Sequence, residues 1–251
     1  MACSQRCKEK YVPTVIAAAA LFFYCFGYSW LLNVLPQYYV DLACLSLANE
    51  TYLECSSNAS SPLWSNATTV ANTQGSLLMT WLNVVAAVFC PTLCTLADSV
   101  GRKPILIVST LFTSVFLVVA FAVPPSWFAA YSVYVAAVSG IGGSVYCYLA
   151  LTFSVVADLT ADATSKGRAV AFGVVESMCW GGLAVGPVAA SFFVSALAPH
   201  KDTGGIQQVL VVGFAAQMAG LALVMFGLPE TLAQKQRITW VGLKVLSCTA
   251  A

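Results

Sequence analysis

Charged residues are scarce in this chain of 251 amino acids. Asp, Glu, Lys and Arg make up 8% of the residues, whereas 59% are hydrophobic. A typical soluble domain has about 25% charged residues. The net charge of +1 leaves no basic excess to bind nucleic acid, so no nucleic-acid partner is expected. This composition predicts a protein that lies mostly in lipid.

Motifs for ATP hydrolysis and for common enzyme chemistries are also missing. The sequence has no Walker loop, no His-Glu-x-x-His pair and no nucleophile elbow. No apolar segment carries the repeated arginines of a voltage sensor. We therefore expect neither an enzyme nor an ATP-driven pump, and no cofactor.

Six long apolar runs are the dominant feature of the chain. Each is close to the roughly 17–25 residues with which a helix crosses a bilayer, and too long for the strands of a β-barrel. We expect an all-α membrane protein with a short N-terminal segment at residues 1–11 and the start of a linker at residues 229–251. The predicted spans run from Val12 to Leu35, Gly75 to Leu96, Ile105 to Val123, Trp127 to Val156, Ala169 to Leu197 and Ile206 to Leu228.

Basic residues lie almost entirely on one side of these spans. Positively charged loops stay in the cytosol, so we expect both termini to be cytosolic. The plasma membrane and an endolysosomal membrane both remain open as locations. Only Lys201 lies in the opposite set of loops; the cytosolic set is Arg6, Lys8, Lys10, Arg102, Lys103, Lys166, Arg168, Lys235, Arg237 and Lys244.

The segment 36–74 is predicted to be a glycosylated outer loop. It holds three Asn-x-Ser/Thr sequons, at Asn49, Asn58 and Asn66, and sequons are modified only on the lumenal side. Cys44 and Cys55 share this loop, where a disulfide is chemically permitted. The two cysteines either pair with each other or with a loop outside this sequence.

The five cysteines in the predicted spans are expected to be small packing residues. Cys90 and Cys94 lie one helical turn apart on one face. No His or carboxylate accompanies them, so no metal site is expected. The remaining three are Cys25, Cys147 and Cys179.

The short loop between the second and third spans carries the most specific motif. Gly101 permits a tight turn, and Asp98 and Arg102 can form a charge-assisted pair. Residues 94–103 resemble the signature loop of the major facilitator superfamily, Gly-x-x-x-Asp-Arg-x-Gly-Arg-Arg/Lys. Cys94 and Ser99 depart from that pattern. The resemblance implies a clamp that stabilises one transport conformation, formed by Asp98, Gly101, Arg102 and Lys103.

Three more segments resemble the same family in order and spacing: Asp158 to Arg168, Gly181 to Pro187 and Pro229 to Leu232. The resemblance implies the N-terminal half of a major facilitator fold, built from three-plus-three inverted repeats. A second six-helix half, from missing sequence or by dimerisation, would complete a cavity for a small solute. The alternative is a truncated regulatory or assembly partner that transports nothing.

Small residues in the spans are predicted to let helices approach closely. Static packing and a rocking interface both remain open as their role, and Pro187 is expected to bend the fifth span. The residues are Gly140, Gly143, Gly182, Gly186 and Pro187.

Glu176 is the only acidic or basic residue well inside the predicted spans. A charge there is costly, which makes this carboxylate a candidate for proton coupling. The alternative is a side chain that reaches the membrane interface. Residues 173–177 resemble the proton-coupled folate transporter subgroup, which implies symport through Glu176 and a solute such as an organic anion.

Other polar or aromatic residues in the spans are candidates for lining a central cavity. Each is also compatible with packing or with an interface position. The residues are Tyr24, Tyr28, Asn33, Asn83, Tyr146 and Trp180.

Overall fold

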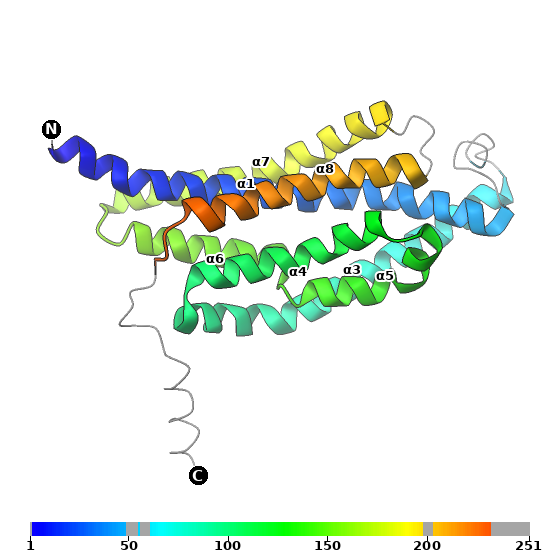
Figure 1. Ribbon diagram of the computed structural model, residues 1–251, viewed down its shortest axis with the longest axis horizontal. Coiled ribbons are helices and arrows are strands. Elements are labelled where there is room, and N and C mark those ends of the chain that lie inside the picture. The colour runs from blue at the N-terminus through cyan, green and yellow to red at the C-terminus, as the bar shows by residue number, and fades with distance from the viewer. Residues whose placement is uncertain (1, 49–54, 56–60, 198–202, 232–251) are drawn as a thin grey trace, which may run out of the picture.

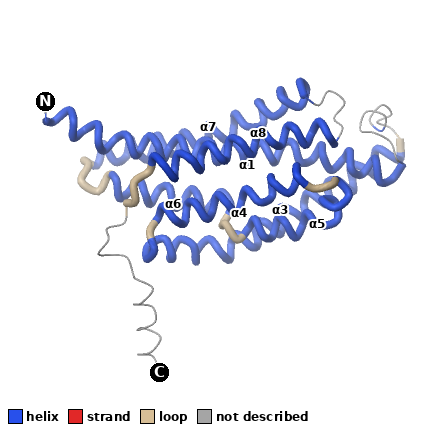
Figure 2. Tube along the Cα trace, viewed as in Figure 1, coloured by secondary structure: helices blue, strands red, loops and turns tan. Residues whose placement is uncertain are grey.

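The computed structural model describes residues 2–48, 55, 61–197 and 203–231, and within them it contains helices and connecting turns. The helices run side by side along one long axis (Figures 1 and 2). Their bounds are α1 Ala2–Ala48, α3 Pro62–Val100, α4 Arg102–Ala122, α5 Pro125–Gly140, α6 Ser144–Leu159, α7 Ser165–Leu197, α8 Thr203–Ala222 and a π-helical turn η1 Leu223–Gly227.

These elements form six stretches long and apolar enough to cross a membrane. α5 and α6 together make one stretch, Pro125–Leu159, and α8 continues into η1 to make another, Gly205–Gly227. The prediction of an all-α protein with six spanning helices is confirmed. α1 packs against α7, α8, α3 and α6, and so lies at the centre of the bundle.

The predicted outer loop is much shorter than the sequence suggested. α1 continues past Pro36 to Ala48 because its buried side chains continue at helical spacing through Tyr38, Tyr39 and Leu42. Pro36 itself lies on an exposed side of the helix. The prediction that 36–74 is a loop is therefore wrong, since helix covers most of it.

α3 begins earlier than predicted because a proline and a serine mark its start. Pro62 occupies the first turn, where its missing N–H costs nothing, and the Ser61 hydroxyl accepts the N–H of Trp64 at 3.1 Å. Of the three sequon residues, Asn66 is exposed in the first turns of α3. Asn49 and Asn58 lie outside the described residues.

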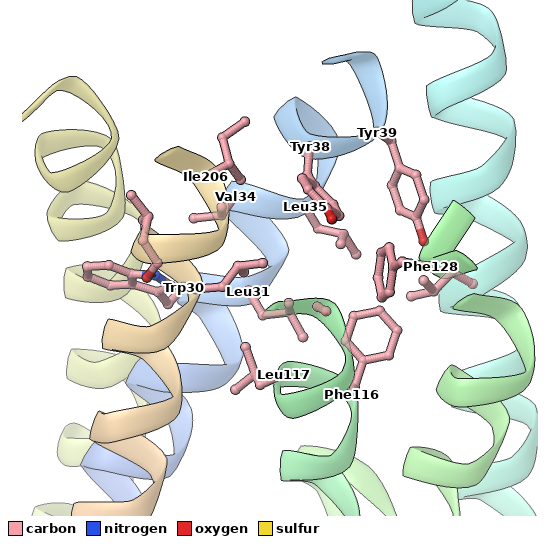
Figure 3. Close-up of a cluster of buried hydrophobic side chains, with 14 of the residues drawn as sticks. Trp30, Leu31, Val34, Leu35, Tyr38, Tyr39, Phe116, Leu117, Phe128 and Ile206 are labelled. Atoms are coloured by element: carbon pink, nitrogen blue, oxygen red, sulfur yellow. The ribbon is translucent and has the colours of Figure 1, made fainter. Parts of the chain in front are cut away.

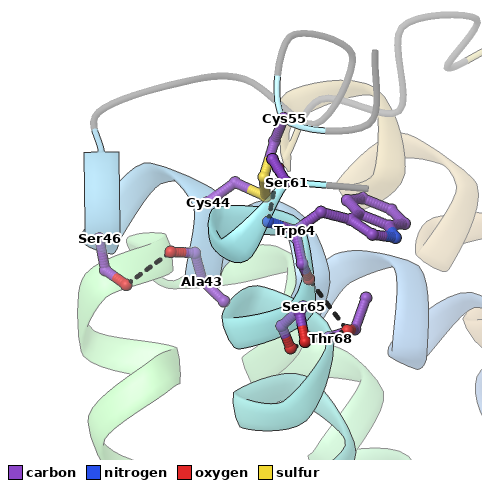
Figure 4. The surroundings of a disulfide bond; sticks show 8 residues. All are labelled: Ala43, Cys44, Ser46, Cys55, Ser61, Trp64, Ser65 and Thr68. Atoms are coloured by element: carbon purple, nitrogen blue, oxygen red, sulfur yellow. Dashed lines mark hydrogen bonds between the residues drawn. A yellow bond between two sulfur atoms is a disulfide. The ribbon is translucent and has the colours of Figure 1, made fainter. Parts of the chain in front are cut away.

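A disulfide joins Cys44 of α1 to Cys55, which precedes α3 in the chain (Figure 4). This is one of the two pairings that the sequence left open. Both cysteines are buried, beside Ala43 and Ala67. The bond lies at one end of the bundle, which we call the disulfide end.

Breaking this bond is expected to loosen the disulfide end. Cys44→Ser and Cys55→Ser should each lower the stability of the detergent-solubilised protein, by about 2–4 kcal/mol for a disulfide of ordinary strength. Thermal unfolding with and without reductant measures the change. Wild type should lose stability on reduction, whereas both variants should be insensitive to it; equal sensitivity in all three proteins would contradict the pairing.

The span that contains α5 and α6 is interrupted at residues 141–143. Gly143 has φ of +77°, a conformation that favours glycine, and it starts α6. The Ser109 hydroxyl of α4 donates to the Gly142 carbonyl at 2.6 Å. At Gly140 an added Cβ would lie 2.7 Å from the Leu82 carbonyl oxygen of α3. The turn is therefore held between α3 and α4.

A large apolar core fills the part of the bundle nearer the disulfide end. Trp30, Phe116 and Phe128 are at its centre and are fully buried (Figure 3). The Trp30 indole donates to the Val209 carbonyl at 3.0 Å, so its polar edge is satisfied inside the core. This core fixes α1, α4, α5 and α8 relative to one another.

α1 and α7 approach most closely where α7 is rich in glycine. A Cβ added at Gly182 would lie 2.5 Å from the Phe22 carbonyl oxygen, and one at Gly186 would lie 2.8 Å from that of Phe26. The Ser29 hydroxyl donates to the Gly182 carbonyl at 3.1 Å. The predicted close approach at these glycines is therefore present in the structure.

Candidate functional site: the charged end and the open face

Arg102 organises the end of the bundle opposite the disulfide. Its Nε lies 2.9 Å from an Asp158 carboxylate oxygen, and its Nη2 lies 3.4 Å from Asp98 Oδ1. The Arg102 side chain is 14% exposed, against 69% for Asp98. Arg102 begins α4, Asp158 lies near the end of α6, and Asp98 is in the last turn of α3. One guanidinium thus links three helices, at what we call the charged end.

The chain after the sixth span joins this cluster. The backbone N–H of Arg102 donates to Glu230 Oε1 at 3.2 Å, and the Thr231 hydroxyl pairs with Asp158 Oδ2 at 3.1 Å. Gly101 has φ of +127°, and a Cβ there would lie 2.6 Å from the Glu230 carboxylate. Glycine is therefore needed at 101 for its backbone conformation and for the approach of Glu230.

Two more basic side chains donate hydrogen bonds to backbone carbonyls at helix ends near the charged end. Lys103 Nζ donates to the carbonyls of Met225 and Leu228, at 2.7 and 2.8 Å. The Arg168 guanidinium donates to the Thr160 and Ala161 carbonyls after α6. These cations satisfy carbonyls that lack a partner within their own helix.

The four residues predicted to form a clamp are therefore gathered in one network. Asp158 and Glu230 belong to the same network, although the sequence did not indicate that they do. Both lie in segments that resemble the family, but a single sequence does not show which acidic residue pairs with Arg102. Whether the network stabilises one transport conformation stays a prediction.

A second notable region comprises the exposed sides of α3 and α7, which we call the open face. Only 22% of the most apolar window of each helix is buried, against 61% for α1. The exposed side chains on this face include Trp81 and Val88 on α3 and Val188 and Phe192 on α7. Large parts of both helices are thus uncovered in this structure.

Glu176 lies on α7 with its side chain exposed. It is eleven residues after Ser165, where α7 begins, which corresponds to about 16 Å along the helix axis. This position is three turns inside the helix. Asp41 also lies within a spanning helix, because α1 is longer than predicted; it is 1% exposed.

The six residues predicted to line a cavity divide into two groups. Tyr146 and Trp180 are each 64% exposed, and Asn83 is also exposed. Tyr24 is fully buried; its hydroxyl pairs with Thr113 Oγ1 at 2.9 Å and its ring stacks on Tyr148 at 4.0 Å. Tyr24 is thus a packing residue within this bundle.

The other two cavity candidates also contact the interior of the bundle. Tyr28 is 8% exposed, and the Asn33 amide donates to the Pro187 carbonyl of α7 at 3.3 Å. Pro187 lies inside α7 rather than at its end. Asn33 therefore ties α1 to α7 beside the proline.

A polar stripe along the exposed side of α3 was not predicted. Its hydroxyls donate back to the helix: Thr69 to the Ser65 carbonyl at 2.7 Å and Thr80 to that of Ser76 at 2.8 Å. Their oxygens remain able to accept hydrogen bonds from outside. Polar residues at helical spacing were the available signal; the stripe is Thr69, Asn72, Thr73, Ser76, Thr80 and Asn83.

Two hollows adjoin this stripe. One, of about 310 Å³, lies between α1 and α3 and is lined by Leu32, Pro36, Tyr39, Asn72 and Met79 among others. The second is a shallow depression on the surface of α3 alone, along the stripe itself. The open face is therefore both polar and hollowed toward the disulfide end.

Comparison with known proteins identifies the fold. Residues 17–246 match the Major Facilitator Superfamily. The crystal structure of the human organic anion transporter MFSD10 (TETRAN) superposes with a TM-score of 0.64 at 16% identity, over 91% of this chain and 50% of that one. A search of curated proteins found no match. The chain thus spans half the length of its structural neighbour.

The match covers most of the chain, and the arrangement of six spanning helices agrees with it. At 16% identity, the structural neighbour is evidence for the fold alone. This chain belongs to the Major Facilitator Superfamily, and its residues form a six-helix half of that fold.

Proposed function

We propose that the chain carries a small solute across a membrane by alternating access, together with a second six-helix half that covers the open face. The observation that carries this proposal is the polar stripe on α3. A polar or charged side chain in lipid is costly, so such residues in a spanning helix normally face water or protein. The stripe and Glu176 are both exposed in this half.

The hollow between α1 and α3, beside the stripe, supports a solute cavity between two halves. Carriers of this architecture place their solute near the midplane, at the interface of the repeats. The structural neighbour is an organic anion transporter. Organic anions are therefore the first class of solute to test.

The proposed orientation places the charged end and both termini in the cytosol. The distribution of Lys and Arg supports it. The disulfide end would then face the lumen or the exterior, where disulfides persist and sequons are glycosylated. A plasma membrane or an endolysosomal membrane fits both features.

The proposed coupling ion is the proton, taken up by Glu176. Glu176→Gln removes the titratable group but keeps its size. In cells that express the protein, uptake of organic anions should rise at acidic outside pH in wild type. This acid stimulation should be lost in Glu176→Gln, because an amide cannot bind and release the proton. Uptake at matched surface expression measures the effect.

Two variants make this experiment specific. Glu176→Asp keeps a carboxylate and should retain acid stimulation. Ser177→Ala removes an exposed neighbouring hydroxyl that donates to the Gly173 carbonyl, and it should behave as wild type. If uptake depends on pH equally in Glu176→Gln and wild type, Glu176 is not the proton-coupling group. The proposal that the chain belongs to a solute carrier would still stand. No uptake of any organic anion would remove that solute class.

A further inference from the structure

Three thiols meet inside the bundle between α3 and α6. The sulfur atoms of Cys90, Cys94 and Cys147 all lie within 4.8 Å of one another. Cys147 is buried, and the other two are half-buried. The sequence indicated only the pair on α3 and therefore no metal site, because nothing in the spacing places Cys147 beside it.

The local backbone explains why Cys147 reaches this position. α6 starts at the turn that ends with Gly143, whose positive φ redirects the chain. A Cβ at Gly143 would lie 2.9 Å from the Cys147 sulfur and 3.4 Å from Leu93 Cδ1 of α3. The turn thus presses the first part of α6 against α3, on the face that carries Cys90 and Cys94.

Ligand chemistry narrows what such a cluster can bind. Thiolate ligands select soft cations, chiefly Cu⁺ and Zn²⁺ among the common biological metals. A metal–sulfur distance of about 2.3 Å puts three ligand sulfurs roughly 4 Å apart. The sulfurs here are already within 4.8 Å of one another, so small side-chain rotations suffice to close the site.

The surroundings of the cluster also suit a cation. Cys94 lies one turn from Asp98, so the cluster is close to the charged end and its water. A cation can reach the cluster from the surface through the half-buried Cys90 and Cys94, whereas Cys147 is the buried ligand on the inner side. Binding would release a proton from each thiol, and the cation would offset only part of the thiolate charge, leaving a net −1 with Zn²⁺ and −2 with Cu⁺.

We propose that Cys90, Cys94 and Cys147 together bind one soft cation, Cu⁺ or Zn²⁺, and that the ion fastens α3 to the start of α6. Three sulfur ligands suffice for trigonal Cu⁺. Zn²⁺ is almost always four-coordinate and would require a water as its fourth ligand. The proposal does not depend on transport, because binding is measured directly.

The test uses the purified full chain in detergent under anaerobic conditions without added reductant, so that the Cys44–Cys55 disulfide stays intact. The Cys25 and Cys179 sulfurs lie 3.4 Å apart, so both residues are first changed to Ala to remove a second thiol pair. Cys3, Cys7 and Cys248 are changed to Ser. Cu⁺ and Zn²⁺ are then titrated separately against competing chelators, and bound metal is counted by mass spectrometry.

One ion per chain is expected, with affinity at least about tenfold lower in Cys90→Ala and in Cys147→Ser. X-ray absorption should show three sulfur neighbours for Cu⁺, or three sulfurs and one oxygen for Zn²⁺. If Cys147→Ser fails to fold, Cys90→Ala still tests the site, because the Cys90 side chain is only half-buried. If both metals bind no more tightly than to a chain lacking all three thiols, the cluster is packing only and the proposal fails.

Discussion

Arg102→Ala is expected to lower the stability of the solubilised protein by about 2 kcal/mol, less than the roughly 3–5 kcal/mol for breaking a fully buried ion pair. The side chain is 14% exposed and approaches two carboxylates, at 2.9 and 3.4 Å. Removing it leaves Asp98 and Asp158 close together without their shared cation. The loss should therefore exceed that for an ordinary surface ion pair, which contributes about 0–1 kcal/mol.

Lys166→Ala is the matched control, because it removes an exposed cation from the first turn of α7, at the same end of the bundle. It should change stability by no more than about 0.5 kcal/mol. Arg102→Lys should be intermediate, since an ammonium group lacks the planar fork that meets two carboxylates at once. Thermal unfolding, followed by tryptophan fluorescence, ranks the variants; equal effects of Arg102→Ala and Lys166→Ala would contradict the network.

A double-mutant cycle separates the contribution of Asp158. Asp158→Asn alone should destabilise the protein, but it should cost less in the Arg102→Ala background, where the ion pair is already absent. Strict additivity of the two changes would show that they do not interact. The cycle tests the inter-helix contact itself, whereas the single variants test the whole site.

The sequence sufficed to predict six spanning helices and the charged turn at 98–103, because both depend on local pattern. Apolar length identifies a spanning helix, and Gly101 with Asp98 and Arg102 identifies a charged turn. The continuation of α1 past Pro36 was missed because proline is an unreliable sign of a helix end. Buried side chains on either side of it maintain the helix.

Contacts between distant helices could not be predicted in the same way. The pairing of Arg102 with Asp158 and the meeting of Cys147 with Cys90 both depend on how helices pack, and one sequence contains no signal for that. The stripe on α3 is an intermediate case. Its residues recur at helical spacing, but only the structure shows that Thr69 and Asn83 face outward while Ala71 and Leu78 face inward.

Gly182→Ala is expected to destabilise the bundle strongly, because the α1–α7 contact has no room for one more carbon. The added Cβ would lie 2.5 Å from the Phe22 carbonyl oxygen and 3.0 Å from the Phe26 nitrogen. Both atoms belong to the backbone of α1, so neither can rotate away. Overpacking of this kind typically costs about 1–3 kcal/mol.

Gly173→Ala on the same helix is a close control. An added Cβ there meets nothing within 4 Å. Both substitutions gain up to about 1 kcal/mol of helix propensity, so Gly173→Ala should be neutral or slightly stabilising. The difference between the two variants in thermal unfolding then isolates the contact with α1. A Gly182→Ala protein as stable as Gly173→Ala would show that α1 and α7 are not in close contact.

The same comparison bears on how a carrier of this kind moves. If Gly182 holds the α1 and α7 backbones together, these helices cannot slide past each other without losing that contact. Conformational change would then be confined to the uncovered sides of α3 and α7, where Gly173 and the polar stripe lie. In that case Gly182→Ala should reduce the amount of folded protein, whereas a bulky residue at Gly173 should leave folding intact and impair uptake.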